Sequence, residues 1–470
     1  MIALSLAEIA DAIGGRLVIG ASGAERSDVV TGLAQTDSRE IQPGGIFFAK
    51  RGEETDGHLF VGAAVENGAA LLVVEREVHD RVPQIVVADT VEALGALARE
   101  VVARVRALGR LRVVAVTGSN GKTTTKNLLR DILATQGETV APEKSFNNEV
   151  GAPLTMLRVT ESTRYLVAEM GASVAGDIAR LIGLVRPDVG IVLTVGLAHA
   201  GEFGGIETTF RAKSEMVTGL EPTDTAVLNR DDARVAAMAG LTPAEVLWFG
   251  RSEEAGVRAS DVVVHPWGTT FTLHLPGEGP RPVAFRVLGE HHVTNALAAA
   301  AATWRLGVPA DAIVAGLEAV TRAERWRMEV LPGRDGVTVI NDAYNASPDS
   351  MAAALRTLAQ IAPEGGRTVA VLGEMTELGD LHGEEHDRIG LLVVRLNIDK
   401  LVVVGPGARR LFLSAVNQGS WADECLFAET ADEAFDLLAG LIRPGDTVLV
   451  KSSNAAGLRF LGDRLAEHLA

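Results

Sequence analysis

The sequence contains one cysteine, few aromatic residues and no long uninterrupted hydrophobic run. Because Cys425 is its only cysteine, an intramolecular disulfide framework and a zinc site made of several cysteines are both excluded. No segment reaches the roughly 18 uninterrupted apolar residues of a membrane helix. The first five residues lack the basic stretch and the apolar run of a secretory signal. These absences predict a cytoplasmic protein that does not insert into a membrane.

Basic residues are outnumbered by acidic ones. The chain has 44 Lys and Arg against 61 Asp and Glu, a formal net charge of −17. This balance argues against a general binder of nucleic acid or anionic membranes, although a local basic pocket can still hold an anionic substrate. Aromatic residues make up 4% of the chain and hydrophobic residues 47%, so aliphatic side chains fill an ample core. A chain of 470 residues is long enough for about three domains.

Periodicity divides the chain into three blocks, and we expect an α/β protein with three domains. Residues 1–109 contain short strands and a helix at 90–107, which predicts a small α/β N-terminal domain. Residues 110–324 alternate apolar strands with helices, which predicts a central P-loop-type, mostly parallel sheet with crossover helices. Within it, 248–286 resembles a small antiparallel excursion. Residues 325–470 repeat the alternation as a Rossmann-like C-terminal domain.

The motif that carries most chemistry is TGSNGKTTTK, residues 117–126, between an apolar strand and an amphipathic helix. In that setting the backbone N–H groups of the turn and the positive end of the helix point at one place and can hold phosphates. Lys122 adds a charge, and Thr123 offers a hydroxyl to a phosphate-bound Mg²⁺. The full P-loop pattern has a glycine where Val116 stands, so a chance match is the alternative. The flanking strand and helix favour a nucleoside triphosphate site.

Polar residues follow other strands of the central block, at the sheet edge where parallel sheets bind ligands. Glu169 ends the apolar run 166–168 and is a candidate Mg²⁺ ligand, with a helix-capping or solvated glutamate as the alternative. His199 follows another strand; imidazole is an uncommon Mg²⁺ ligand, so a structural histidine competes with a ligand. Lys213 lies in a helical stretch and, taken alone, is typical of a surface lysine.

Three further residues stand at element ends. Asn295 opens an Ala-rich helix, where its amide could cap the helix or bind an adenine edge. Arg327 lies among charged residues beside Trp326, as on a surface or a hinge. Asp342, in NDAYNASP, follows a strand and precedes a helix, which is where a Rossmann-like unit presents ligands; helix capping is an equal competitor for Ser347.

In this order and combination, the motifs resemble the Mur ligase family over nearly all of the chain. The resemblance implies an ATP-dependent amide ligase of peptidoglycan precursor synthesis. It would phosphorylate the terminal carboxylate of a UDP-N-acetylmuramoyl-tripeptide, and the amine of D-alanyl-D-alanine would attack the acyl phosphate. Four parts of the sequence point to this branch of the family: 36–39 with 44–49, 147–151, 341–347 and 372–379. The Asp-Asn-Pro-Arg motif of the ligase that adds the third residue is not found.

The resemblance also implies an ATP site that contains Mg²⁺. ATP would be bound by the turn and by three later residues that contact adenine, phosphate and ribose in that order: Gly118, Ser119, Asn120, Gly121, Lys122, Thr123 and Thr124, then Asn295, Arg327 and Asp342. Thr123 and Glu169 would hold one Mg²⁺. His199 would hold a second with Lys213, which the family carries in carbamylated form. The predicted catalytic residues are Lys122, Glu169, His199 and Lys213.

The two other substrates are assigned by the same resemblance. The UDP-sugar would contact six residues: Ser38, Arg39, Gly52, His58, Asn147 and Asn148. The dipeptide would contact Asn345, Ala346 and Ser347. Arg327, at the joint between the second and third blocks, would couple ATP binding to a domain closure that excludes water. We expect a monomer.

Two departures from the family and two other functions stay open. Residues 171–174 lack a polar pair, so we assign them no contact, and Trp326 stands where a glycine is common, which leaves the hinge geometry open. One alternative is another Mur-type ligase, either the third-residue-adding enzyme or one like folylpolyglutamate synthase, which would not need the first block. The other is a nucleotide-binding regulator, which would not need Glu169, His199 and Lys213 together.

Overall fold

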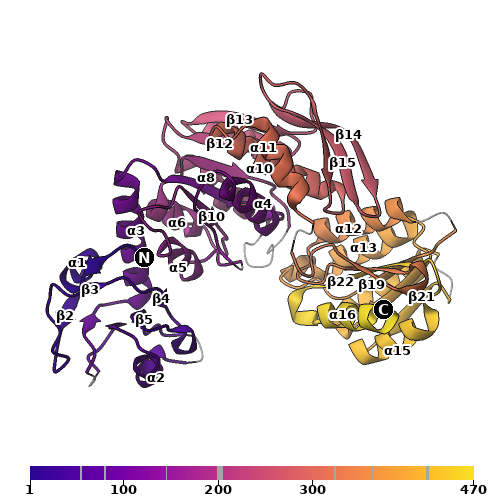
Figure 1. Cartoon of the computed structure of the whole chain (residues 1–470). Coiled ribbons are helices and arrows are strands. Elements are labelled where there is room, and N and C mark those ends of the chain that lie inside the picture. Colours follow the sequence, from indigo (N-terminus) through magenta and orange to yellow (C-terminus); the bar gives the residue numbers. More distant parts are fainter. Residues whose placement is uncertain are drawn as a thin grey trace.

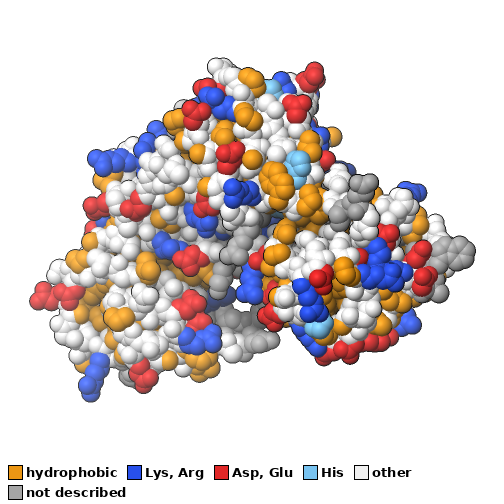
Figure 2. All heavy atoms as spheres, turned by 45° about the vertical axis from the view of Figure 1, so that its right-hand side comes forward, with side chains coloured by type: hydrophobic (Ala, Val, Ile, Leu, Met, Phe, Trp, Pro, Cys, Tyr) orange, Lys and Arg blue, Asp and Glu red, His pale blue; other side chains and the backbone are white. Residues whose placement is uncertain are grey.

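The computed structural model describes residues 1–52, 55–78, 81–143, 145–197, 205–321, 324–362, 365–419 and 423–470. Three α/β units follow one another along the chain and form an arch, with the N-terminal and C-terminal units as its two feet (Figure 1). This arrangement confirms the predicted α/β class. Within the described ranges, every helix is too short or too polar to cross a bilayer. Figure 2 shows acidic and basic side chains interspersed over one face.

The N-terminal unit is built on a five-stranded sheet. Its helix α1 (Leu6–Ala12) begins with a capping box between Ser5 and Glu8, as that sequence pattern predicts. The long helix α3 (Thr90–Ala107) leaves this unit and packs against helices of the central unit. The strand order is β2 (Arg16–Val18), β7 (Gln84–Val86), β6 (Leu71–Val74), β5 (Ile46–Phe48) and β4 (Ala34–Gln35), beside the short helix α2 (Val61–Glu66) and the pair β1 (Leu4–Ser5) and β3 (Val29–Val30).

The central unit is a nine-stranded sheet that is parallel except at one edge. Its order is β16 (Arg281–Phe285), β15 (Gly268–His274), β14 (Val257–His265), β13 (Glu245–Gly250), β12 (Thr225–Asn229), β11 (Val189–Val192), β8 (Arg112–Thr117), β10 (Tyr165–Glu169) and β9 (Thr139–Val140). Strands β14, β15 and β16 pair antiparallel, which confirms the predicted antiparallel excursion. They extend the same sheet rather than leave it.

Helices cover both faces of the central sheet. One core lies under α3, α5 (Gly151–Met156), α6 (Asp177–Val185) and α8 (Ile206–Thr218). The other lies under α4 (Lys122–Ala134), α10 (Glu290–Arg305) and α11 (Ala310–Ala319), while the short α9 (Ala233–Ala237) follows β12. The residues of α10 from Ala296 to Ala302 are completely buried, because the helix packs against the sheet on one side and against α4 and α11 on the others.

The C-terminal unit is a six-stranded sheet in the order β17 (Glu329–Pro332), β18 (Thr338–Asn341), β22 (Thr447–Lys451), β19 (Thr368–Leu372), β20 (Lys400–Val404) and β21 (Cys425–Ala428). All pairs are parallel except β17 with β18. One face carries α12 (Pro348–Ile361), α13 (His382–Arg395) and α14 (Arg409–Asn417), and the other carries α15 (Ala431–Leu441) and α16 (Leu458–Leu469). Polar residues follow β18 and β22 at their carboxyl ends, where such sheets bind ligands.

Candidate functional site

The turn between β8 and α4 has the backbone of a phosphate-binding loop. Gly118 and Gly121 have φ values of 153° and 85°, in the region that side chains rarely adopt. A Cβ on Gly121 would lie 2.2 Å from Oδ1 of Asn295, so no other residue fits there without a shift. Helix α4 begins at Lys122 without a side-chain cap, which leaves its first N–H groups available to an anion.

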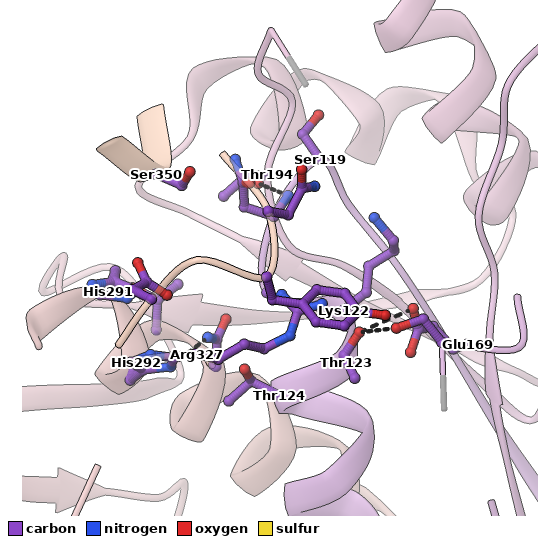
Figure 3. A pocket seen from close by; sticks show the side chains of 18 of the residues that line it. Ser119, Lys122, Thr123, Thr124, Glu169, Thr194, His291, His292, Arg327 and Ser350 are labelled. Atoms are coloured by element: carbon purple, nitrogen blue, oxygen red, sulfur yellow. Dashed lines mark hydrogen bonds between the residues drawn. The ribbon is translucent and has the colours of Figure 1, made fainter. Parts of the chain in front are cut away.

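A cavity of about 320 Å³ opens over this turn and is shared by two units of the protein (Figure 3). The central unit supplies the turn itself, Glu169 from the end of β10, and His292 and Asn295 from α10. The C-terminal unit supplies Arg327, Asp342, Tyr344, Asn345 and Lys451. The structure therefore brings every described residue of the predicted ATP site, except Gly118, to the wall of one cavity of ligand-binding size.

Lys122 lines the cavity. Its Nζ donates to the carbonyl of Gly118 at 2.8 Å. Burial lowers the pKa of Lys122, and the nearby Glu169 carboxylate partly offsets this effect. An anionic phosphate beside the ammonium would favour its charged form.

Glu169 and Thr123 offer a set of oxygen atoms suited to Mg²⁺. Oε1 of Glu169 accepts from Oγ1 of Thr123 at 3.3 Å and from Nδ2 of Asn147 at 2.8 Å. Oε2 is buried and has no hydrogen-bond partner among the described residues, a costly state for a carboxylate unless a cation lies beside it. Oγ of Ser145 lies 3.1 Å from Oγ1 of Thr123. One carboxylate with hydroxyls and water is a common set for Mg²⁺ in phosphate sites.

Lys213 is not a surface residue, although its surroundings in the sequence are typical of one. It lies in α8 and is 3% exposed. Burial, together with the positive charge of Lys122, lowers the pKa of Lys213 to about 7. An amine with this pKa is partly neutral at physiological pH, and the neutral form is the nucleophile. His199, predicted to act with Lys213, lies outside the described residues.

Lys213 faces a second cavity, of about 540 Å³, which adjoins the first. Lys122 and Asn147 line both cavities. The second is also lined by Asn148 and by residues 171–174, to which the sequence assigned no contact. Two separate ligands can thus meet at Lys122, one on each side.

A buried ion pair, missed by the sequence analysis, closes the C-terminal side of the first cavity. Nζ of Lys451 lies 2.6 Å from Oδ2 of Asp342, and the two side chains are 2% and 13% exposed. Oδ1 of Asp342 accepts from the N–H of Met328 at 3.0 Å. Lys451 ends the apolar strand β22, and a charge at the carboxyl end of such a strand is the signal that could have identified it.

Arg327 projects into the cavity from a constrained segment. Its guanidinium lies over the ring of Tyr344, 4.4 Å from the centroid. Both neighbours adopt the left-handed conformation, with φ values of 60° for Trp326 and 49° for Met328. Nε1 of Trp326 donates to the carboxylate of Asp463 in α16 at 3.0 and 3.1 Å. Trp326 thus adopts the φ that a glycine would, and its side chain is attached to the C-terminal unit.

The predicted dipeptide residues lie beside this cavity. Oδ1 of Asn345 accepts from the N–H of Ala346 at 2.9 Å, and Ala346 is buried. Ser347 caps α12, and its hydroxyl also donates to Oδ1 of Asn120 at 3.1 Å. Both roles considered for Ser347, in capping and at the site, are therefore compatible.

The residues predicted to bind the UDP-sugar fall into two groups. Asn147 and Asn148 line the second cavity, while the other four belong to the N-terminal unit. Ser38 is buried, and its carbonyl accepts from Asn67; the Arg39 side chain is 86% exposed and pairs with Asp37. Both ring nitrogens of His58 are occupied within the fold, by Asp56 at 2.6 Å and by the N–H of Glu75 at 2.9 Å. The N–H of Gly52 donates to the carbonyl of Thr55.

Three family models match the chain in the order of its units. The model of the Mur ligase family catalytic domain matches residues 33–102, the Mur ligase middle domain matches 116–303, and the model described as Mur ligase, glutamate ligase domain, matches 326–454.

Individual proteins match over most or nearly all of the chain. The chain is 42% identical to the UDP-N-acetylmuramoyl-tripeptide–D-alanyl-D-alanine ligase of Mycobacterium tuberculosis, over 99% of this chain and 98% of that protein. A crystal structure of MurF from Acinetobacter baumannii superposes with a TM-score of 0.89 at 32% identity, over 99% of each chain. MurF ligase from Thermotoga maritima in complex with ADP gives a TM-score of 0.81 at 28% identity, over 93% of this chain and 98% of that one.

Proposed function

The chain belongs to the Mur ligase family, and we propose that it joins D-alanyl-D-alanine to a UDP-N-acetylmuramoyl-tripeptide with consumption of ATP. Relatives that carry this name and align from end to end support the choice of substrates. The structural observation that carries the proposal is the meeting of two cavities at Lys122. A nucleotide in the first cavity and a peptide carboxylate in the second would come together at this ammonium.

The chemistry that fits is activation of the carboxylate by phosphorylation. A carboxylate oxygen of the tripeptide attacks the γ-phosphorus of ATP, and the bond from that phosphorus to ADP breaks. The amine of the dipeptide then attacks the acyl carbon and loses a proton, and phosphate leaves with the former carboxylate oxygen. Lys122 and the N–H groups at the start of α4 stabilise the charge that builds up during transfer.

Glu169 and Thr123 would hold one Mg²⁺, which would neutralise charge on the ATP phosphates. We assign Lys213 to a second cation together with His199, after carbamylation turns its amine into an oxygen ligand. The low pKa of Lys213 and its burial support this assignment, because a neutral amine is required to react with CO₂.

The remaining residues would bind and orient the three substrates. Asn295 would contact adenine, Arg327 the phosphates and Asp342 the ribose. The UDP-sugar would be bound by six residues: Asn147, Asn148, Ser38, Arg39, Gly52 and His58. The dipeptide would be bound by residues 345–347. The hydrogen bond between Ser347 and Asn120 supports a closed state in which the C-terminal unit covers the phosphate loop. We also propose that the enzyme is a monomer and that it acts in the cytoplasm.

Phosphate release with each substrate omitted in turn tests this function. The ligase reaction requires release that depends on both the UDP-tripeptide and D-alanyl-D-alanine, with ADP formed in equal amount. Running the assay once with lysine and once with 2,6-diaminopimelate at the third peptide position identifies the preferred tripeptide. Release with neither substrate would indicate a plain ATPase, and release that needs a folate and glutamate would indicate the folylpolyglutamate synthase-like reaction instead.

A further inference from the structure

Lys126 is the last residue of the phosphate-loop motif, and the phosphoryl-transfer chemistry assigns it no role. It lies one turn further along α4 than Lys122, and its side chain is completely buried. Burial lowers the pKa of Lys126, while the carboxylates of Glu169 and Glu324 act in the opposite direction. A methionine would fill the same space without the cost of placing an ammonium away from water. The amine of Lys126 is therefore expected to serve something other than packing.

The amine of Lys126 holds the connecting segment, residues 141–150, which joins β9 to α5. Its Nζ donates to the carbonyl of Pro142 at 2.8 Å, 16 positions later in the chain. The described residues of the connecting segment belong to no helix or strand. Such a stretch lacks the repeated backbone hydrogen bonds that fix regular elements, so single contacts determine where it lies. The bond from Lys126 fixes the first part of the connecting segment.

The later part of the connecting segment lies between the two cavities. Asn147 lines both of them, and its Nδ2 donates to Oε1 of Glu169 at 2.8 Å. The carbonyl of Asn147 accepts from the N–H of Gly171 at 2.8 Å. Ser145 lines the first cavity, and Asn148 lines the second. The connecting segment thus presents side chains to both of the ligands that the proposed function requires.

The amide of Asn147 has little room to move. A Cβ on Gly171 would lie 2.8 Å from Oδ1 of Asn147, so this amide packs directly against the backbone that follows β10. Its hydrogen bond to Glu169 would weaken steeply if the connecting segment shifted. The connecting segment is therefore held at two places, by Lys126 on α4 and by the end of β10.

We propose that Lys126 is a positioning residue, whose ammonium holds the connecting segment so that Asn147 can contact the UDP-tripeptide in the second cavity. Among the described residues that line the two cavities, Lys126 does not occur, so it acts through Asn147. The phosphates of ATP would be held by the turn 118–121 and by Lys122, which do not depend on the bond to Pro142. The inference rests on the proposed function and names a residue outside both cavities that sets the affinity for one substrate.

Steady-state kinetics of phosphate release by the full-length enzyme test this role. Lys126→Met removes the ammonium and keeps the length of the side chain. The KM for the UDP-tripeptide should rise about tenfold, because Asn147 is no longer held in place, whereas the KM for ATP should change less than about twofold. In an Asn147→Ala enzyme, Lys126→Met should raise the KM for the UDP-tripeptide by less than about threefold, since the residue through which Lys126 acts is already lost.

Two further variants support the comparison. Arg130→Met removes a partly exposed cation one turn further along α4, and this matched control should leave both KM values unchanged. Lys126→Gln also removes the charge and shortens the side chain, so it repeats the test if Lys126→Met does not fold.

Several outcomes overturn the proposal. A role in folding alone would lower the amount of active enzyme, and with it kcat, but would leave both KM values of Lys126→Met unchanged. A rise of equal size in the KM for ATP, or a full effect that persists in Asn147→Ala, would show that Lys126 does not act through Asn147. Failure of both Lys126 variants to fold would show that the residue serves the fold as a whole. A wild-type enzyme whose phosphate release does not depend on the UDP-tripeptide would instead refute the proposed function.

Discussion

Removal of either member of the Asp342–Lys451 pair should destabilise the protein far more than removal of a surface ion pair. The two charged atoms are 2.6 Å apart, and both side chains are largely buried. Lys451 also donates to the carbonyls of Asp342 and Asn345, at 3.4 and 3.1 Å. The pair therefore ties together the carboxyl ends of the neighbouring strands β18 and β22.

The separation of the charges sets the expected magnitude. At an effective dielectric constant of 20, unit charges 2.6 Å apart attract each other by about 6 kcal/mol. Desolvation of two ions offsets much of this gain, so the pair as a whole contributes little. Loss of one partner leaves the other charge buried and unpaired. Lys451→Met or Asp342→Asn should therefore each lower the free energy of unfolding by about 3–5 kcal/mol.

Urea denaturation followed by circular dichroism measures these changes. The double variant should lose less than the sum of the single variants, with a coupling of about 1.5 kcal/mol or more. Arg16→Gln, which breaks the exposed pair with Glu77, is the matched control and should cost less than about 1 kcal/mol. Additive losses in the double variant, or single losses as small as that of the control, would refute the reasoning.

Three further predictions concern the active site. Glu169→Gln keeps the acceptor for Asn147 but loses the negative charge that would lie beside Mg²⁺. The Mg²⁺ concentration for half-maximal phosphate release should therefore rise at least about tenfold. An unchanged Mg²⁺ titration would contradict the metal assignment. Lys213→Ala should be nearly inactive, and wild-type enzyme freed of CO₂ should recover with bicarbonate. Because the pKa of Lys213 is lowered to about 7, the recovery rate at constant dissolved CO₂ should rise as pH increases toward 7 and level off above it; a rate still rising in proportion to hydroxide up to pH 9 would mean an ordinary lysine. Trp326→Phe keeps the contact with Phe460 but loses the hydrogen bond to Asp463, so the free energy of unfolding should fall by about 1–3 kcal/mol. An unchanged free energy of unfolding in urea would show that this hydrogen bond does not stabilise the protein.

Local patterns predicted much of the fold, because hydrophobic periodicity and turn residues act within short stretches. The helix predicted at 90–107 is α3 with the same limits, and the phosphate loop stands between β8 and α4 as its sequence context indicates. Glu169 reaches Thr123 because parallel strands β8 and β10 end at one sheet edge. The six-residue helix α5 was not predicted, since it is too short to show a helical period.

The rest of the site depends on contacts between distant segments. Lys213 is typical of a surface lysine in its own helix, and it is buried only because α8 packs onto the central sheet. The partner of Asp342 comes from a strand 109 positions later in the chain. His292 lies three positions before Asn295, but the lack of a partner for its Nε2 among the residues that the structure describes is a property of the assembled cavity. No periodicity within a short window contains this information.

The constrained segment around Arg327 has a mechanical consequence. Trp326 is attached to α16 through Asp463, and the N–H of Met328 is bonded to Asp342, so both neighbours of Arg327 belong to the C-terminal unit. Arg325 also pairs with Asp463, so the segment from Arg325 to Met328 is attached to the C-terminal unit at several points. In the proposed function Arg327 would then move as part of the C-terminal unit and would reach the phosphates of ATP only when that unit closes over them. The C-terminal unit would thus act toward ATP as an activating partner protein does when it delivers an arginine in trans, except that here the partner is covalently attached.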